Sequence, residues 1–131
     1  MHRWAEHTSE LELEIEAATE REVFLEALDA FVELVDGGGD SVRTERREVE
    51  LRGDDRESLL VAWLDELAYL SETQRFVPEG VRELNLGDGT LHATLHGHRG
   101  KPRDLLKAVT LHRLLFAPQA DGWRARVVLD V

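Results

Sequence analysis

Carboxylates near the two ends of the sequence offer the clearest chemistry that residue types and spacing suggest. Glu10 opens a stretch in which acidic and apolar residues alternate, and Asp130 is followed directly by Val131 with its terminal carboxylate. Hard cations such as calcium prefer clustered oxygen ligands. Glu10, Asp130 and the Val131 carboxylate therefore form a candidate cation site. The alternative is ordinary surface acids in a chain with 27 acidic residues, and spacing alone favours that alternative.

Histidines offer a second candidate site. His92, His96 and His98 share one face if their segment is a strand. Neutral imidazoles on one face could bind zinc, but no cysteine or carboxylate is placed to complete the ligand set, so a solvated face is the favoured interpretation. His112 stands among apolar neighbours, where a hydrogen-bonded structural histidine is favoured over a general base.

No arrangement typical of an enzyme is visible in the chain. No nucleophile stands in a recognisable motif with a base. Gly37-Gly38-Gly39 follows an expected helix and precedes an expected strand, whereas a phosphate-cradling loop leads from a strand into a helix. We interpret these glycines as a helix terminator and predict that the protein is not an enzyme on its own.

Composition narrows the class of protein further. The 131 residues, 42% hydrophobic and 33% charged, fit a single domain over residues 1–131. No apolar run approaches the roughly 20 residues that span a bilayer, the start lacks the blocks of a signal peptide, and there is no cysteine. A cytoplasmic location is therefore expected. The formal net charge of −11 argues against direct nucleic-acid binding and suits a basic protein partner, a bound cation or simple solubility.

Periodicity indicates two helices. Thr19 followed by Glu22 is typical of a capping box, and apolar residues then recur at helical spacing as far as Val35. Asp54 or Asp55 is expected to cap a second helix with an apolar stripe that ends near Leu70.

Alternation and turn signals indicate six strands, at residues 10–17, 41–51, 81–86, 90–98, 109–116 and 123–131. The order is β-α-β-α-β-β-β-β. We predict an α+β fold, a two-layer sandwich in which two helices pack on one face of a mostly antiparallel or mixed sheet of about six strands. Function is then expected on the other face or at its ends.

Four stretches of the sequence resemble the archease family. Residues 6–10 resemble its E-H-T-A-D segment, and residues 60–69 resemble its L-x-x-W-L-x-E-L-x-Y/F run. Residues 107–112 are close to its K-A-V-T-Y-H motif, and residues 123–131 resemble its W-x-x-x-V-V-L-D-I ending. The order and spacing agree along nearly the whole chain. Three positions depart from the family pattern: Glu10 for aspartate, Leu111 for tyrosine and Arg113 for aspartate.

The resemblance implies an accessory protein for an RtcB-type RNA ligase in tRNA splicing or RNA repair. Such a ligase joins a 3′-phosphate or 2′,3′-cyclic phosphate end to a 5′-hydroxyl end through a guanylylated histidine, using GTP and manganese. The archease is expected to promote guanylylation and multiple turnover, and to carry a divalent cation, calcium or alternatively manganese. Carried over to this sequence, the metal ligands are Glu10, Asp130 and Val131. The rival hypotheses are an acidic binding module with a different partner and a metal-dependent hydrolase.

Overall fold

The computed structural model describes residues 1–7, 10–36, 44–101 and 106–131. In this part of the chain it contains two helices and seven strands. The elements are, in chain order, β1 (His2–His7), β2 (Glu10–Ala17), α1 (Glu20–Val35), β3 (Thr44–Arg52), α2 (Arg56–Thr73), β4 (Phe76–Gly87), β5 (Thr90–Arg99), β6 (Ala108–Gln119) and β7 (Gly122–Asp130).

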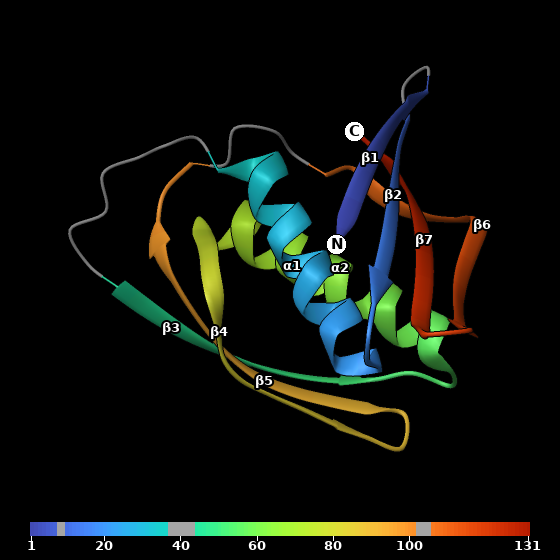
Figure 1. Ribbon diagram of the computed structural model, residues 1–131. Coiled ribbons are helices and arrows are strands. Elements are labelled where there is room, and N and C mark those ends of the chain that lie inside the picture. The colour runs from blue at the N-terminus through green and yellow to red at the C-terminus, as the bar shows by residue number, and fades with distance from the viewer. Residues whose placement is uncertain (8–9, 37–43, 102–105) are drawn as a thin grey trace.

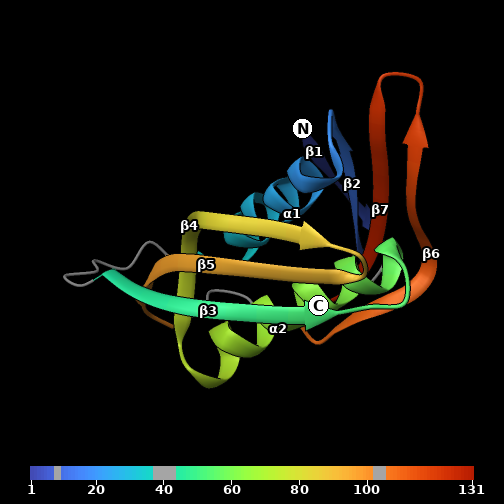
Figure 2. The ribbon, with the colours of Figure 1, turned by 90° about the horizontal axis from the view of Figure 1, so that it is seen from below.

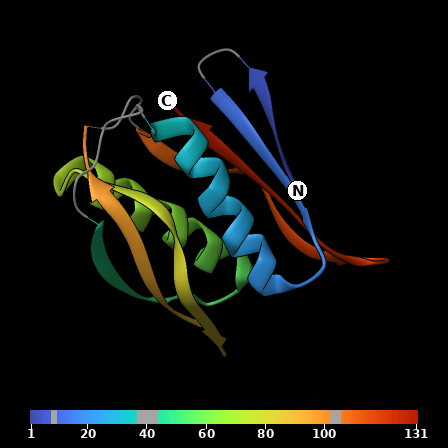
Figure 3. The same ribbon diagram turned by 60° about the vertical axis from the view of Figure 1, so that its left-hand side comes forward.

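The strands form two antiparallel sheets, and both helices contact both of them. One sheet has the order β1-β2-β7-β6 and the other has the order β3-β5-β4. α1 packs on β2 and β4, whereas α2 packs on β3, β4 and β6. The helix pair is thus flanked by the two sheets (Figures 1, 2 and 3). The α+β class is confirmed, but two sheets replace the single expected one, because each sheet brings its own apolar face to the helices.

The helices begin where the capping signals place them. Thr19 is the N-cap of α1, with its hydroxyl accepting from the Glu22 amide at 3.1 Å, and Asp55 caps α2 by accepting from the Ser58 amide at 2.7 Å. Trp63 of α2 is fully buried and donates its indole N–H to the Phe24 carbonyl of α1 at 2.9 Å. This hydrogen bond fixes the two helices to each other inside the core. No helix in the described ranges is long and apolar enough to cross a membrane.

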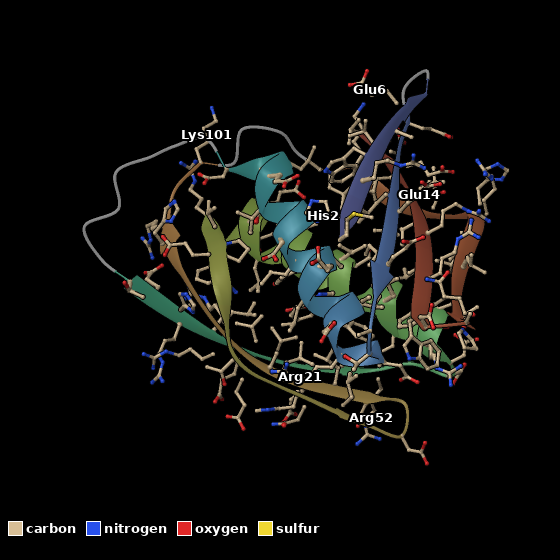
Figure 4. All side chains as sticks on the ribbon, in the orientation of Figure 1. His2, Glu6, Glu14, Arg21, Arg52 and Lys101 are labelled. Atoms are coloured by element: carbon tan, nitrogen blue, oxygen red, sulfur yellow. The ribbon has the colours of Figure 1, made fainter. Side chains whose placement is uncertain are left out.

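The additional strand β1 is held against α1 by His2. Its Nδ1 lies 2.9 Å from Glu26 Oε2 and its Nε2 lies 3.0 Å from Glu33 Oε2, as the labelled His2 facing α1 in Figure 4 illustrates. Burial alone would lower the pKa of His2, but hydrogen bonds to the two glutamates outweigh it, so the pKa is raised. The charged form of His2 therefore strengthens the contact between β1 and the helix.

Two strands differ from their predicted bounds because bulges interrupt the alternation. β4 begins at Phe76, five residues before the expected start, and its register shifts between Pro78 and Gly80 and again after Val81. β6 shifts register between Thr110 and Leu115. An extra residue in one strand breaks the period of two on which the prediction depends. The glycine terminator at residues 37–39 and the predicted start of a strand at residues 41–43 lie outside the described residues.

Candidate functional site

The pairing of β2 with β7 places Glu10 directly opposite Asp130. Directly opposed residues of an antiparallel pair have Cβ atoms about 4.5–5.5 Å apart and project from the same face. Both residues are partly exposed. The two carboxylates, which are 120 positions apart in the sequence, can therefore contact one small cation. The C-terminal end of the chain lies near the end of the sheet where β2 begins (Figures 1 and 3).

Val131 packs its side chain against the core, as the alternation of the last strand predicts. The backbone beside it is held in place, because the Asp130 carbonyl accepts a hydrogen bond from the Lys107 amide at 2.9 Å. The terminal carboxylate thus follows Asp130 from a fixed strand. Carboxylate oxygens are the donors that a hard cation prefers, so the chemistry of Glu10, Asp130 and Val131 fits calcium or manganese. Two of these donors are side chains and the third is the chain terminus.

Three of the sequence motifs converge at this end of the four-stranded sheet. Glu10 belongs to the first motif and Asp130 to the last, and Ala108, from the motif at residues 107–112, is the β6 partner of Asp130. Glu6, labelled near the same end in Figure 4, pairs with Leu11, so it belongs to the opposite face of the pleat from Glu10. One cross-strand row therefore contains residues from three motifs that are remote in sequence.

An ion pair with one buried partner lies beside the candidate site, and the sequence did not predict it. Glu12, two residues beyond Glu10 on the same face of β2, is only 4% exposed. Arg113 Nη1 lies 2.6 Å from Glu12 Oε1, in an ion pair whose geometry is not that of a hydrogen bond. Arg113 has a left-handed φ of 57° in the β6 bulge, and its carbonyl accepts from Arg126 Nε at 2.8 Å. The one available signal was arginine in place of the family's aspartate.

The rest of this sheet face carries charge pairs along the strands. Arg3 of β1 and Glu14 of β2 are cross-strand partners and form an ion pair. The hydrogen bond from Arg3 lowers the pKa of Glu14 and raises that of Arg3 itself. Glu14 is therefore neutralised locally, whereas neither Glu10 nor Asp130 has an ion pair among the described contacts. Glu10 and Asp130 therefore lie side by side at the end where the motifs meet, with no neutralising partner among the described contacts.

The three histidines of β5 do not combine into a metal site. The expected solvated face is wrong for His98, which is only 6% exposed and whose Nδ1 lies 2.6 Å from Glu79 Oε1. His96 packs over Gly80, where an added Cβ would come within 2.8 Å of its Cε1, and His92 Nε2 is 3.9 Å from Glu50. Each ring has its own neighbour. Within the described ranges, no group of three His, Asp or Glu side chains is arranged to hold a metal ion.

The interpretation of His112 as a structural histidine among apolar neighbours is wrong. His112 is exposed, and its amide donates to the Thr110 hydroxyl at 3.3 Å. The β6 bulge between Thr110 and Leu115 breaks the alternation and brings Leu111, His112 and Arg113 to the surface together. Leu111 is 74% exposed, so the bulge presents an apolar side chain close to the acidic end of the sheet.

Comparison with known proteins gives a consistent result. The matching family model is that of the archease protein family, over residues 2–131. The chain is 37% identical to Protein archease of Methanosarcina acetivorans, covering 99% of this chain and 95% of that protein. It is 34% identical to Protein archease of Archaeoglobus fulgidus, covering 99% and 98%.

Solved structures show the same fold. A solution structure of a Methanobacterium thermoautotrophicum protein matches with a TM-score of 0.71 and 26% identity, covering 99% of this chain and 98% of that chain. The crystal structure of an archease, described as a possible chaperone, from Thermotoga maritima matches with a TM-score of 0.72 and 24% identity, covering 100% and 98%.

Proposed function

Since the chain belongs to the archease protein family, we propose that it is an accessory protein of an RtcB-type RNA ligase, in tRNA splicing or RNA repair. It promotes guanylylation of the ligase and so supports multiple turnover, without joining RNA itself. The observation that carries the proposal is the cross-strand row in which Glu10 meets Asp130, because it unites three motifs at one end of the sheet.

The proposed cation site consists of Glu10, Asp130 and the Val131 carboxylate. A bound calcium ion, or manganese in its place, supplies positive charge that holds these carboxylates together. Glu10 has one methylene more than aspartate, so its carboxylate reaches further across the row. The Val131 side chain anchors the terminus in the core, and the hydrogen bond between Lys107 and Asp130 keeps the neighbouring backbone in place.

The proposed mechanism is electrostatic. The chain carries a net charge of −11. Glu10 and Asp130 lie at one end of the four-stranded sheet, and the β6 bulge lies close to the same end. We propose that this end docks beside the metal and nucleotide pocket of the ligase and favours its guanylylation-competent state, which requires a difference in affinity between the two states of the ligase. The exposed Leu111 adds apolar contact area there.

The test is a ligation assay with the host's own ligase and with substoichiometric amounts of this chain. Unmodified protein should convert a few turnovers of the ligase into many, and should join no RNA when the ligase is absent. Asp130→Asn removes one charge with almost no change in shape and should abolish most of the stimulation. Asp121→Asn, at the exposed turn before β7, is the matched control and should stimulate normally.

A second measurement separates the cation site from the ligase partner. Calcium should raise the melting temperature of the unmodified chain and of Asp121→Asn, because a ligand that binds only the folded state stabilises it. The increase should be much smaller for Asp130→Asn. An identical shift in all three proteins would place the cation elsewhere. Unchanged ligase turnover over a full titration would instead refute the accessory role, and capture of another protein would favour the binding-module hypothesis.

A further inference from the structure

A hollow lined by arginines lies at the far end of the other sheet. It has a volume of about 390 Å³ and is lined by Arg47, Thr73, Gln74, Arg75 and Arg99; we call it the arginine hollow. It forms where α2 ends, where β3 begins and where β5 ends. The last two points lie on the same side of the molecule, at the left of Figure 1. Nothing in the proposed function uses this place.

The charge of the arginine hollow is opposite to that of the whole chain. Three guanidinium groups line it and no described carboxylate does, although the net charge of the protein is −11. Two of these arginines form ion pairs with Glu45, whose oxygens lie 3.6 Å from Arg47 Nη2 and 3.6 Å from Arg99 Nη2. Charge-assisted hydrogen bonds measure about 2.7–2.9 Å. Glu45 therefore balances part of the charge without closing hydrogen bonds to either guanidinium.

Arg47 is held in position before any ligand arrives. Its Nε donates to Gln74 Oε1 at 2.7 Å, and its Cζ lies 4.9 Å from the centre of the Phe76 ring. A planar guanidinium that stacks on an aromatic ring loses little further freedom when it binds an oxyanion. The contact with Gln74 also fixes the amide whose nitrogen is a further donor at the rim of the hollow.

Arg75 occupies a backbone conformation that normally belongs to glycine. It follows Gln74, the C-cap of α2, and has a left-handed φ of 53°. Helices often end with glycine at this position, because a side chain there is disfavoured. The Arg75 carbonyl accepts from the Gly100 amide at 2.8 Å, which ties the end of α2 to the residue after Arg99. An unfavourable conformation of this kind is a pointer to function when the surrounding structure maintains it.

From these observations we propose that the arginine hollow binds a compact phosphate monoester dianion. A phosphate group offers several charged oxygens, and arginine binds such groups through paired N–H donors. A long nucleic acid would carry most of its phosphates beyond the hollow, where they meet a protein with a net charge of −11, whereas a small phosphorylated molecule meets only the local positive charge. The C-terminal end of α2 carries partial negative charge, which by itself attracts arginines. A direct binding measurement therefore distinguishes a ligand site from arginines that only stabilise the end of the helix.

The experiment is a titration with inorganic phosphate in calcium-free buffer, with chloride holding the ionic strength constant, followed by backbone amide NMR. We expect saturable shifts confined to Gln74, Arg75 and Gly100 and their surroundings. The double variant Arg75→Gln/Arg99→Gln should bind at least about tenfold more weakly. Arg82→Gln, an exposed charge on β4, is the matched control and should bind within about twofold of the unmodified chain.

Three results would overturn the proposal: shifts that never saturate, shifts spread over the whole surface, or equal affinity in the double variant and the unmodified chain. Amide signals far from the hollow report whether the double variant is folded. The single variant Arg99→Gln leaves the backbone at Arg75 unchanged and provides a second test, in which we expect an intermediate loss of phosphate affinity.

A comparison of phosphate sources tests whether the ligand is compact. A nucleoside monophosphate should bind at least as tightly as inorganic phosphate. A ten-nucleotide RNA with a 3′-phosphate should bind more weakly, because most of its phosphates lie outside the hollow and are repelled by the net charge of −11. Tighter, steeply salt-dependent binding of the RNA would overturn the compact-ligand proposal and make an RNA end the ligand.

Discussion

Replacing Arg113 with glutamine should destabilise the fold, because the change leaves a carboxylate buried without its counter-charge. The Glu12 side chain is 6% exposed, the Arg113 side chain is 47% exposed, and the charged atoms are 2.6 Å apart. Breaking a fully buried pair costs about 3–5 kcal/mol, and an exposed pair contributes about 0–1 kcal/mol. With one partner buried and the other half exposed, we expect a loss of about 2 kcal/mol, between these two limits.

A double-mutant cycle measured by urea denaturation provides the assay. Arg113→Gln should lower the free energy of unfolding by about 2 kcal/mol, and Glu12→Gln should lower it by less, because the remaining guanidinium can reach water. The double variant should be more stable than Arg113→Gln alone, with a coupling energy of about 1–2 kcal/mol. If the effects of the two single variants simply add, the ion pair does not stabilise the protein and the reasoning is refuted.

The same substitution should act in the opposite direction on the proposed cation site. Glu12 and Glu10 are two residues apart on one strand, which corresponds to about 7 Å. At that distance a guanidinium and a divalent cation repel by about 1.2 kcal/mol in the dielectric of water, about 80, and by more in the lower effective dielectric, about 20, near a protein surface. Arg113→Gln should therefore bind calcium about tenfold more tightly while being less stable without it. Calorimetric titration measures this, and an unchanged affinity would separate Arg113 from the cation site.

Two further predictions concern the core and the contact between β1 and α1. His2→Gln should reduce the dependence of stability on pH. The two α1 carboxylates raise the pKa of His2 above its ordinary value of 6.5. The stability that charged His2 contributes is therefore complete below about pH 6.5 and is lost as the pH rises through the raised pKa. Melting temperatures at pH 6 and pH 8 should accordingly differ less in this variant than in the unmodified chain. Trp63→Phe removes the indole donor from the buried Phe24 carbonyl and leaves a cavity, so the free energy of unfolding measured in urea should fall by about 2–3 kcal/mol. Tyr69→Phe is the control: its site is 53% exposed, and it should lower the free energy of unfolding by less than about 0.5 kcal/mol.

The sequence predicted those elements whose local signals agree with their packing. Strict alternation predicted β2. Thr19 correctly marked the start of α1, and of the two candidate caps for α2, Asp54 and Asp55, the structure uses Asp55. β1 was not predicted, because His2–His7 contains one large apolar residue, Trp4, and gives no alternating pattern. Its place is set by pairing with β2 and by the contact of His2 with α1. Such tertiary contacts leave no periodic trace in the sequence.

The candidate site was predicted only in part, for a related reason. The polar face of β2 and the final strand together suggested Glu10 and Asp130, and the observed register brings them opposite each other. The same alternation placed Glu12 on the polar face of the strand, yet it is buried. Pointing away from the core is not the same as being exposed, because the β6 bulge brings Arg113 onto that face. A bulge inserts residues that the period of two cannot anticipate.

Arg75 and Arg113, whose contacts the sequence did not predict, share a backbone feature. Among the residues that the structure describes, Arg75 and Arg113 are the non-glycine residues with left-handed φ, at 53° and 57°. Glycine would relieve both conformations, but it would also remove the charged side chain. Arg113 neutralises a buried carboxylate beside the acidic end of one sheet, and Arg75 adds positive charge to the arginine hollow at the end of the other. Arg75→Gly and Arg113→Gly would each therefore relieve the left-handed backbone conformation while removing a local positive charge. Arg75→Gly should accordingly raise the free energy of unfolding and weaken phosphate binding.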